Sequence, residues 1–273
     1  MFKKYKKFNV ACVQMNSQDN LDSNILFIKK KILKASKKRA DLVILPENCF
    51  FMGKNDINYI KYSFNEKNHP GIVALQEISK KLNLWIIIGS VNVKEKKNIF
   101  NRSILINNYG KIVGRYDKIH LFSANLPDGK IYNEAKYFKS GKKICLKKLP
   151  WGKIGLTICY DLRFSYLYRK LALKGALFIT VPSAFTEFTG KLHWHTLLKS
   201  RAIETGCYIF APAQCGNHPG NRKTYGHSLI IDPWGKIINE SMKENEIIIS
   251  KIDPHKVLKV RSSIPSLKIN KKI

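Results

Sequence analysis

Short runs rich in Val, Ile, Leu and Phe recur along the whole chain. Ten of them are long enough to be buried strands, at residues 8–14, 41–45, 84–90, 103–107, 111–115, 153–159, 176–181, 207–211, 228–232 and 246–252. Their apolar residues are continuous or alternate, as in strands covered on one or both faces. Four stretches repeat apolar residues at helical spacing, at 21–38, 71–82, 166–173 and 192–205. This mixture predicts an α/β fold in which helices cover a mixed sheet.

Nothing in the sequence divides the chain, because it has no repeat, no low-complexity block and no Pro/Gly/Ser linker. A chain of 273 residues can bury a large core as one unit. No stretch approaches the roughly 18 apolar residues of a membrane span, and only about seven residues precede the first predicted strand. We therefore expect a cytoplasmic protein of one domain whose six cysteines are reduced thiols.

The formal net charge of +30 permits two interpretations. Such a charge is typical of proteins that bind nucleic acid or an anionic membrane surface. Lys is scattered in short groups along the whole chain, however, and no stretch interleaves it with aromatic residues. We favour a compositional bias, with neither a nucleic-acid nor a membrane partner. In either case, anionic small molecules are attracted to such a surface.

Three reactive side chains follow predicted strands. Glu47 comes directly after Leu-Val-Ile-Leu-Pro, Lys118 follows the strand at 111–115, and Cys159 ends Lys-Ile-Gly-Leu-Thr-Ile before a helical stretch. Catalytic groups gather at the carboxyl ends of strands in α/β sheets, where several loops meet. A helix start also favours a thiolate, so we expect a lowered pKa for Cys159. A buried strand cysteine remains an equal alternative on this evidence alone.

These residues lie in segments that resemble the Glu, Lys and Cys motifs of the nitrilase superfamily of carbon–nitrogen hydrolases, in the family's order. The segments are Leu45-Pro-Glu47, Tyr116-Asp-Lys118-Ile-His-Leu-Phe122 and Cys159-Tyr-Asp-Leu-Arg-Phe164. Further stretches resemble the branch of the deaminated glutathione amidases: Pro182-Ser-Ala-Phe-Thr186, Thr189-Gly190, His193-Trp194, Arg201-Ala-Ile-Glu204, Ala213-Gln-Cys-Gly216, Tyr225-Gly-His-Ser228 and Asp232-Pro-Trp-Gly235.

The resemblance covers residues 8–253 and implies a four-layer αββα sandwich. It implies one carbon–nitrogen hydrolase domain over 1–273, with a core at 8–253 and a C-terminal arm at 254–273. It also implies a homodimer or larger homo-oligomer, and we expect no metal and no cofactor. One departure is that Ser165-Tyr166 follows Arg-Phe, where many relatives have Pro-Glu or Ala-Glu.

The resemblance also assigns roles to four residues. Cys159 is expected to be the nucleophile and Glu47 the general acid and base. Lys118 is expected to stabilise the oxyanion, together with the backbone N–H of Tyr160. Glu134, sixteen residues after Lys118, is expected to orient Lys118 and the substrate amide, although an exposed loop Glu is the alternative.

Substrate contacts are expected at Arg163, Phe185 and Thr189, which would line the pocket with Tyr160. Arg163 has two possible roles, as a clamp for a carboxylate or as a partner in an internal salt bridge. His193-Trp194 would open a helix and pack in the core. For His227 we favour a structural role over a contact with the substrate.

The resemblance implies hydrolysis of deaminated glutathione to 2-oxoglutarate and cysteinylglycine through a thioester. An ω-amidase acting on 2-oxoglutaramate is the alternative within the family. A papain-like enzyme that pairs Cys159 with His227 or His193 would be a different class. A polyanion-binding or scaffold protein that has only kept the fold is the remaining alternative, supported by the net charge and opposed by the intact Glu, Lys and Cys.

Overall fold

A computed structural model describes residues 5–54, 56–127, 129 and 131–269, and they form two six-stranded sheets. The first sheet has the order β16 (Ile247–Ile252), β1 (Phe8–Val13), β2 (Leu42–Ile44), β3 (Trp85–Glu95), β4 (Asn98–Ile106), β5 (Ile112–Asp117). The second has the order β15 (Ile237–Glu240), β14 (Leu229–Ile231), β11 (Tyr208–Ala211), β10 (Phe178–Thr180), β9 (Gly152–Leu156), β8 (Cys145–Leu149).

Each sheet has a parallel centre and antiparallel edges. In the first sheet β1, β2 and β3 are parallel neighbours, and in the second β9, β10 and β11 are. The remaining pairs are antiparallel. Parallel strands need crossover connections, which the long helices supply. The ten predicted strands are all present, in these two sheets.

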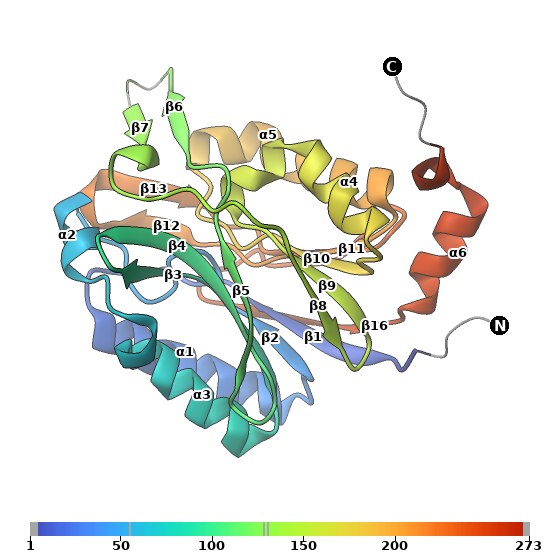
Figure 1. The fold of residues 1–273 in the computed structure, drawn as a ribbon, viewed down its shortest axis with the longest axis horizontal. Coiled ribbons are helices and arrows are strands. Elements are labelled where there is room, and N and C mark those ends of the chain that lie inside the picture. The colour runs from blue at the N-terminus through green and yellow to red at the C-terminus, as the bar shows by residue number, and fades with distance from the viewer. Residues whose placement is uncertain (1–4, 55, 128, 130, 270–273) are drawn as a thin grey trace.

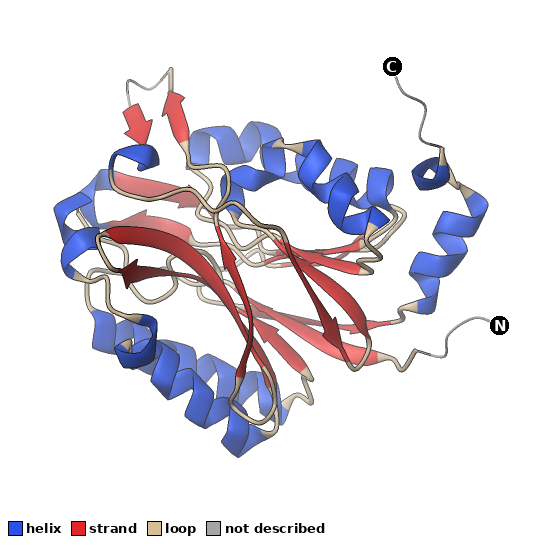
Figure 2. Cartoon of the chain, in the orientation of Figure 1, coloured by secondary structure: helices blue, strands red, loops and turns tan. Residues whose placement is uncertain are grey.

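Helices cover the outer face of each sheet, which makes four layers (Figures 1 and 2). On the first sheet lie α1 (Leu21–Lys37) and α3 (Pro70–Leu82), and on the second lie α4 (Ser165–Leu173) and α5 (Glu187–Thr205). In α1 the predicted apolar stripe is buried, and the side chain of Asn20 caps its first turn by accepting from the N–H of Ser23. The expected αββα sandwich is therefore confirmed.

One helix begins earlier than predicted. The side chain of Thr186 caps α5 by accepting from the N–H of Thr189, so the helix extends five residues before the predicted start at 192. His193 and Trp194 therefore lie inside the helix and do not open it, which corrects that expectation. Trp194 is fully buried, as predicted for a core residue.

Smaller elements surround the sandwich. They are α2 (Asp56–Lys61), α6 (His255–Ser263), the hairpins β6 (Ser123–Asn125) with β7 (Ile131–Asn133) and β12 (Cys215–His218) with β13 (Arg222–Tyr225), and the short 3₁₀ turns η1 (Glu66–Asn68), η2 (Glu134–Lys136), η3 (Cys159–Arg163), η4 (Pro219–Asn221) and η5 (Ser266–Lys268). In Figure 1 the two hairpins lie at the same end of the molecule, while α6 lies at the opposite end.

The core has two parts. One lies between the sheets, where Phe8 of β1 stacks on Trp151 with ring centroids 4.4 Å apart and meets Phe178 of β10 edge-on. The other lies between the first sheet and its helices α1 and α3. All six cysteines are free and buried. Among the described residues, no helix is both long and apolar enough to cross a membrane.

Candidate active site

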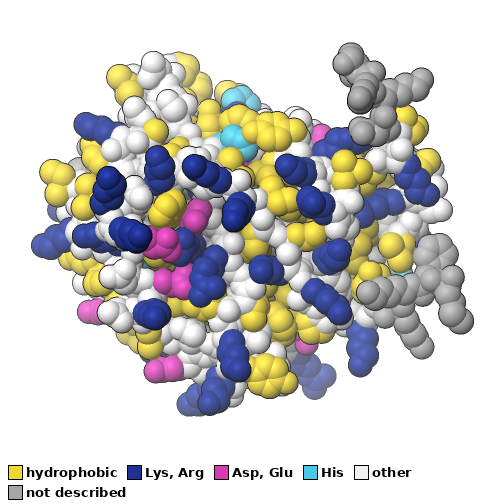
Figure 3. Space-filling model, viewed as in Figure 1, with side chains coloured by type: hydrophobic (Ala, Val, Ile, Leu, Met, Phe, Trp, Pro, Cys, Tyr) yellow, Lys and Arg dark blue, Asp and Glu magenta, His cyan; other side chains and the backbone are white. Residues whose placement is uncertain are grey.

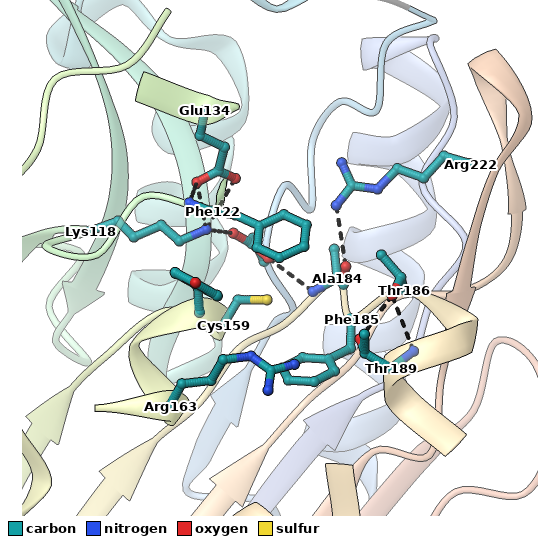
Figure 4. A pocket seen from close by; sticks show the side chains of 12 residues that line it. Lys118, Phe122, Glu134, Cys159, Arg163, Ala184, Phe185, Thr186, Thr189 and Arg222 are labelled. Carbon is teal, nitrogen blue, oxygen red and sulfur yellow. Dashed lines mark hydrogen bonds and ion pairs between the residues drawn. The ribbon is translucent and has the colours of Figure 1, made fainter. Parts of the chain in front are cut away.

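The eight residues predicted for the site line one pocket (Figure 4). The pocket spans about 300 Å³, a volume that includes space open to solvent. It lies where chain segments leave the carboxyl ends of β2, β5, β9 and β10, so both sheets contribute to it. Besides the eight predicted residues, its lining contains Phe122, Ala184, Thr186 and Arg222.

Cys159 occupies a tight turn just after β9. Its φ is 45°, which is uncommon for a residue that carries a Cβ. Its N–H donates to the carbonyl of Pro182 over 3.0 Å, which ties the turn to the segment after β10. Only 8% of the residue is exposed, and Figure 4 shows its Sγ pointing into the pocket. Cys159 therefore lies in a turn at the pocket wall, and not inside a strand.

Buried Asp161 joins the Cys segment to the Lys segment. Its Oδ2 accepts from the Tyr116 hydroxyl over 2.7 Å and from the N–H of Ile158 over 2.9 Å. Its Oδ1 accepts from the N–H of His120, and the His120 ring lies against the same oxygen. The hydroxyl of Tyr166 contacts the other ring nitrogen of His120. Tyr166, at the position that departs from the family pattern, therefore takes part in fixing the two segments.

Lys118 is buried between two carboxylates, with 1% of its side chain exposed. Its Nζ lies 2.9 Å from Oε1 of Glu47, and 3.1 and 2.8 Å from the two oxygens of Glu134. Oε2 of Glu134 also accepts from the N–H of Phe122 over 2.9 Å. Glu134 is thus no free loop residue, since both of its oxygens are engaged beside Lys118.

Glu47 is almost completely buried and makes several hydrogen bonds. Its Oε1 accepts from the amide of Asn101 over 3.0 Å as well as from Lys118, and its Oε2 accepts from the N–H of Ala184 over 2.9 Å. The thiol of Cys159 is a further hydrogen-bond partner. Asn101 and Ala184 were not predicted, because their contacts with Glu47 join segments far apart in the sequence.

The pKa directions define the resting protonation states. Burial has the largest single effect and raises the pKa of Glu47, but the Lys118 ammonium, the Arg222 charge and the Cys159 thiol together hold it below its ordinary value, so Glu47 is ionised. Burial lowers the pKa of Lys118, but Glu134 and Glu47 raise it well above the ordinary value. Burial and then the Glu47 charge raise the pKa of Cys159, and Lys118 opposes them only in part.

This corrects one expectation. The turn after β9 does not give Cys159 a lowered pKa, because burial and Glu47 dominate over any effect of the helix start. The resting pair is a neutral thiol next to an ionised carboxylate. Such a pair needs a base to generate the nucleophile, and Glu47 is in place for that.

The predicted substrate contacts lie on one side of Cys159. The Arg163 guanidinium lies over the ring of Phe185 at 5.4 Å and over that of Tyr160 at 6.0 Å. An Arg163 Nη2 also lies 3.3 Å from Nδ1 of His193. Within the described parts of the chain no carboxylate pairs with Arg163, so the internal salt bridge considered above is not formed. The hydroxyls of Thr186 and Thr189 are 2.8 Å apart.

His227 lies away from this pocket, in a different cluster. Its Nδ1 is 2.7 Å from Oε1 of Glu240, and Nε2 of His195 is 2.9 Å from the same oxygen. These three residues are the group that could hold a metal ion among the residues described, with ligand atoms all within 4.8 Å of one another. His227 and His195 both contact Glu240, and His193 contacts Arg163. Among the described residues, neither His227 nor His193 forms a hydrogen bond with Cys159.

A Glu–Lys–Glu set beside a cysteine, at the strand ends of an αββα sandwich, matches the site expected for a hydrolase of the nitrilase type. The chain belongs to the carbon–nitrogen hydrolase family, whose model matches residues 9–262.

Curated relatives match over most of their length. The chain is 38% identical to the deaminated glutathione amidase of Synechocystis sp., over 96% of this chain and 97% of that protein. It is 34% identical to the deaminated glutathione amidase of Mus musculus, over 94% of this chain and 81% of that protein.

Solved structures agree with the fold. Nit3 of Saccharomyces cerevisiae, a member of branch 10 of the nitrilase superfamily, is 32% identical and superposes with a TM-score of 0.86, over 95% of each chain. The NitFhit protein of Caenorhabditis elegans is 30% identical with a TM-score of 0.90; the match covers 98% of this chain and 66% of that longer one.

Proposed function

We propose that the chain is an amidase that hydrolyses deaminated glutathione to 2-oxoglutarate and cysteinylglycine through a thioester on Cys159. The observation that carries the proposal is the contact of one ionised carboxylate, Glu47, with both the Cys159 thiol and the Lys118 ammonium. The similarity to the deaminated glutathione amidases supports the substrate.

In the first step Glu47 accepts the Cys159 proton as Sγ attacks the amide carbon. The carbonyl oxygen becomes an oxyanion, which accepts hydrogen bonds from the Lys118 ammonium and the backbone N–H of Tyr160. Because Lys118 is held by carboxylates before the substrate arrives, its charge needs no reorganisation during the reaction. Losing one such donor costs roughly 10²–10³ in rate.

In the second step the oxyanion collapses and the carbon–nitrogen bond breaks. Glu47 gives its proton to the departing amine, which leaves an acyl thioester on Cys159. Glu47 then takes a proton from a water molecule that attacks the thioester carbon. The second oxyanion collapses with release of the acid, and Cys159 regains a proton from Glu47. General acid–base help of this kind is worth about 10²–10⁴ in rate.

Glu134 positions Lys118 in this mechanism. Two carboxylates on one ammonium fix both its direction and its charge, and Glu134 is itself fixed by the N–H of Phe122. Arg163, with no carboxylate partner in the described part of the chain, supplies a cation for an acidic substrate. Phe185 and Thr189 form the wall beside it.

The surface supports a small-molecule reaction more than polyanion binding. On the face in Figure 3 the Lys and Arg side chains are dispersed and do not form one continuous stripe. Free thiols at all six cysteines fit a cytoplasmic location, which we also propose.

We further propose a homodimer or larger homo-oligomer that uses the outer surface of α4 and α5. Large apolar side chains are exposed there, among them Tyr166, Leu173, Leu192 and Ile203. Sedimentation equilibrium tests this proposal. A Leu192→Glu variant is expected to shift the assembly toward the monomer, and a wild-type monomer at micromolar concentration would contradict it.

The proposed activity is tested by turnover of deaminated glutathione and of 2-oxoglutaramate under identical conditions, by wild type and Cys159→Ala. We expect a higher kcat/KM for deaminated glutathione, and loss of about 10⁴-fold or more in Cys159→Ala because the covalent route is removed. Faster turnover of 2-oxoglutaramate would support the ω-amidase alternative instead. Tight RNA binding at near-physiological salt, with no amidase activity, would favour a polyanion-binding protein.

A further inference from the structure

Arg222 is a cation in the pocket wall that the mechanism above does not use. It begins β13, and its Nη2 donates to the carbonyl of Ala184 over 3.2 Å. Its Nε is buried and has no hydrogen-bond partner. Over the ranges that the structure describes, no carboxylate forms an ion pair with it. The charges of Glu47 and Glu134 act on the guanidinium without forming an ion pair, but its buried Nε donor has no acceptor, which is unfavourable in the free protein. The position of Arg222 therefore indicates a ligand that accepts this hydrogen bond and carries negative charge.

The hairpin of β12 and β13 holds Arg222 firmly at the pocket. The ring of His218 lies 2.8 Å from the carbonyl of Ser17 and 2.6 Å from the hydroxyl of Thr224, and it is buried. Thr224 bridges to Thr186, and the N–H of Tyr225 donates to the carbonyl of Phe185 over 3.0 Å. The hairpin is thus attached on both sides to segments of the active site. It joins the two stretches, at 213–216 and 225–228, that resemble the deaminated glutathione amidases.

The backbone of Ala184 connects Arg222 to Glu47, the group that transfers protons in the proposed mechanism. The N–H of Ala184 donates to Glu47, and its carbonyl accepts from Arg222. In the proposed mechanism the departing amine receives its proton from Glu47, so the amine nitrogen lies beside Ala184. Substituents of that amine are therefore on the side of the pocket where Arg222 stands.

Arg163 enters the pocket from a different side. Figure 4 shows Arg163 next to Phe185 and below Cys159, and Arg222 beyond Ala184, with the thiol between the two guanidinium groups. Three cations and two carboxylates line the pocket, and both carboxylates contact Lys118. Within the described residues neither arginine forms an ion pair with these carboxylates, although their charges also act on Arg222, so the two arginines are the cations free to pair with the substrate.

We infer that Arg222 binds a carboxylate in the leaving amine, while Arg163 faces the acyl part. This rests on the proposed function and specifies its substrate class: amides that carry a carboxylate on each side of the scissile bond. Deaminated glutathione has both, whereas 2-oxoglutaramate releases ammonia and has only the acyl carboxylate. A site built for a charged group discriminates strongly against a substrate that lacks it.

The experiment measures kcat and KM of wild type, Arg222→Gln and Arg222→Lys with three substrates. These are deaminated glutathione, its methyl ester at the glycine end, and 2-oxoglutaramate. We expect Arg222→Gln to lower kcat/KM for deaminated glutathione about 10- to 100-fold, mainly through KM, with a much smaller effect on 2-oxoglutaramate. Arg222→Lys keeps the positive charge but loses the planar guanidinium, so its kcat/KM for deaminated glutathione should lie between those of wild type and Arg222→Gln. Thermal melting checks that each variant is folded.

The methyl ester makes the test specific for the contact. With wild type, kcat/KM for the methyl ester should be lower than for the free acid by about the factor that Arg222→Gln causes with the free acid. With Arg222→Gln, kcat/KM for the ester should be only slightly lower than for the free acid. The control is Arg39→Gln, because Arg39 is an exposed arginine that does not line the pocket. Its kinetics are expected to match wild type with all three substrates.

The outcomes separate this inference from the proposed function. If wild type hydrolyses deaminated glutathione and 2-oxoglutaramate, and Arg222→Gln lowers kcat/KM for both by the same factor, Arg222 binds the acyl part of the substrate and the inference is wrong. If Arg222→Gln, folded, keeps wild-type kinetics with all three substrates, Arg222 binds no carboxylate and the inference is also wrong. If wild type hydrolyses neither acid, the proposed function fails and the inference fails with it.

Discussion

Lys118 and the two pocket arginines are neighbouring cations whose charges are satisfied differently. Lys118 lies within 3.1 Å of oxygens from both Glu47 and Glu134. Arg163 contacts aromatic rings and His193, and Arg222 contacts a backbone carbonyl. Within the described residues, neither arginine has a carboxylate partner. In the proposed mechanism, the groups that perform the chemistry are therefore already paired in the free protein, whereas the two arginines gain an anionic partner only when the substrate binds.

The difference has an energetic reason. Buried charges that act in every turnover must already be oriented, and mutual pairing offsets their desolvation. Charges that recognise a substrate gain affinity only if they are not already neutralised by the protein. Substitutions of the paired groups should therefore affect both rate and stability, whereas substitution of Arg163 should leave stability almost unchanged.

Glu47→Gln should lower kcat about 10²–10⁴-fold, because Glu47 moves the proton in each step of the proposed mechanism. The variant keeps a side chain of the same shape, so binding of the substrate should change much less than kcat. Steady-state kinetics with deaminated glutathione measure both. Turnover close to wild type would remove Glu47 as the base and point to a different class of thiol enzyme.

Lys118→Met should lower the free energy of unfolding by about 3–5 kcal/mol, because it leaves two buried carboxylates without their cation. Arg163→Met should change it by less than about 1 kcal/mol, since Arg163 has no carboxylate partner among the described residues. Urea denaturation at neutral pH compares them. Equal losses in the two variants would contradict the division between paired and unpaired cations.

The difference in unfolding free energy between wild type and Lys118→Met should depend on pH. The folded protein holds the pKa of Glu47 below its ordinary value of 4.5. Stability from this shift is therefore present above pH 4.5 and is lost as the pH falls through the folded pKa. The stability difference between wild type and Lys118→Met should shrink as the solution is acidified. A difference that stays constant down to acid unfolding would mean that Glu47 does not depend on Lys118.

Glu134→Gln should lower kcat roughly tenfold to a hundredfold, because a displaced Lys118 no longer meets the oxyanion in the right geometry. The control is Glu77→Gln, since Glu77 is exposed on α3. That variant is expected to be indistinguishable from wild type. If the two variants behave alike, Glu134 has no part in positioning Lys118.

The smallest effect concerns the thiol itself. Glu47 raises the pKa of Cys159 and Lys118 lowers it, so Glu47→Gln should lower that pKa relative to wild type. The rate of iodoacetamide labelling at Cys159 as a function of pH, followed by peptide mass spectrometry, measures the shift. An unchanged profile would show that the carboxylate does not act on the thiol.

Much of the fold could be predicted from the sequence, because buried strands and amphipathic helices have strong periodic signals. The predicted strands are all found, whereas β8 was missed because Lys147 and Lys148 interrupt its apolar pattern. The start of α5 was placed five residues late, since its cap depends on the single side chain of Thr186. The short hairpins were missed because they have too few apolar residues to show a period.

The residues of the candidate site could be predicted where they belong to recognisable sequence segments. Residues that reach the pocket only through contacts formed in the folded chain were missed. Glu47, Lys118, Glu134 and Cys159 lie in such segments and meet in the pocket. Arg222 lies between two of them, and the sequence alone gave no sign that it reaches the pocket. The raised pKa of Cys159 depends on burial and on Glu47, which are properties of the folded chain.

The central claim is a covalent acyl intermediate on Cys159, and mass spectrometry tests it most directly. Wild-type protein is mixed with deaminated glutathione, quenched in acid during turnover and digested. We expect a peptide that contains Cys159 and carries the added mass of a 2-oxoglutaryl group, and no such adduct in Cys159→Ala. Continued release of cysteinylglycine with no acylated Cys159 peptide at any quench time would contradict it.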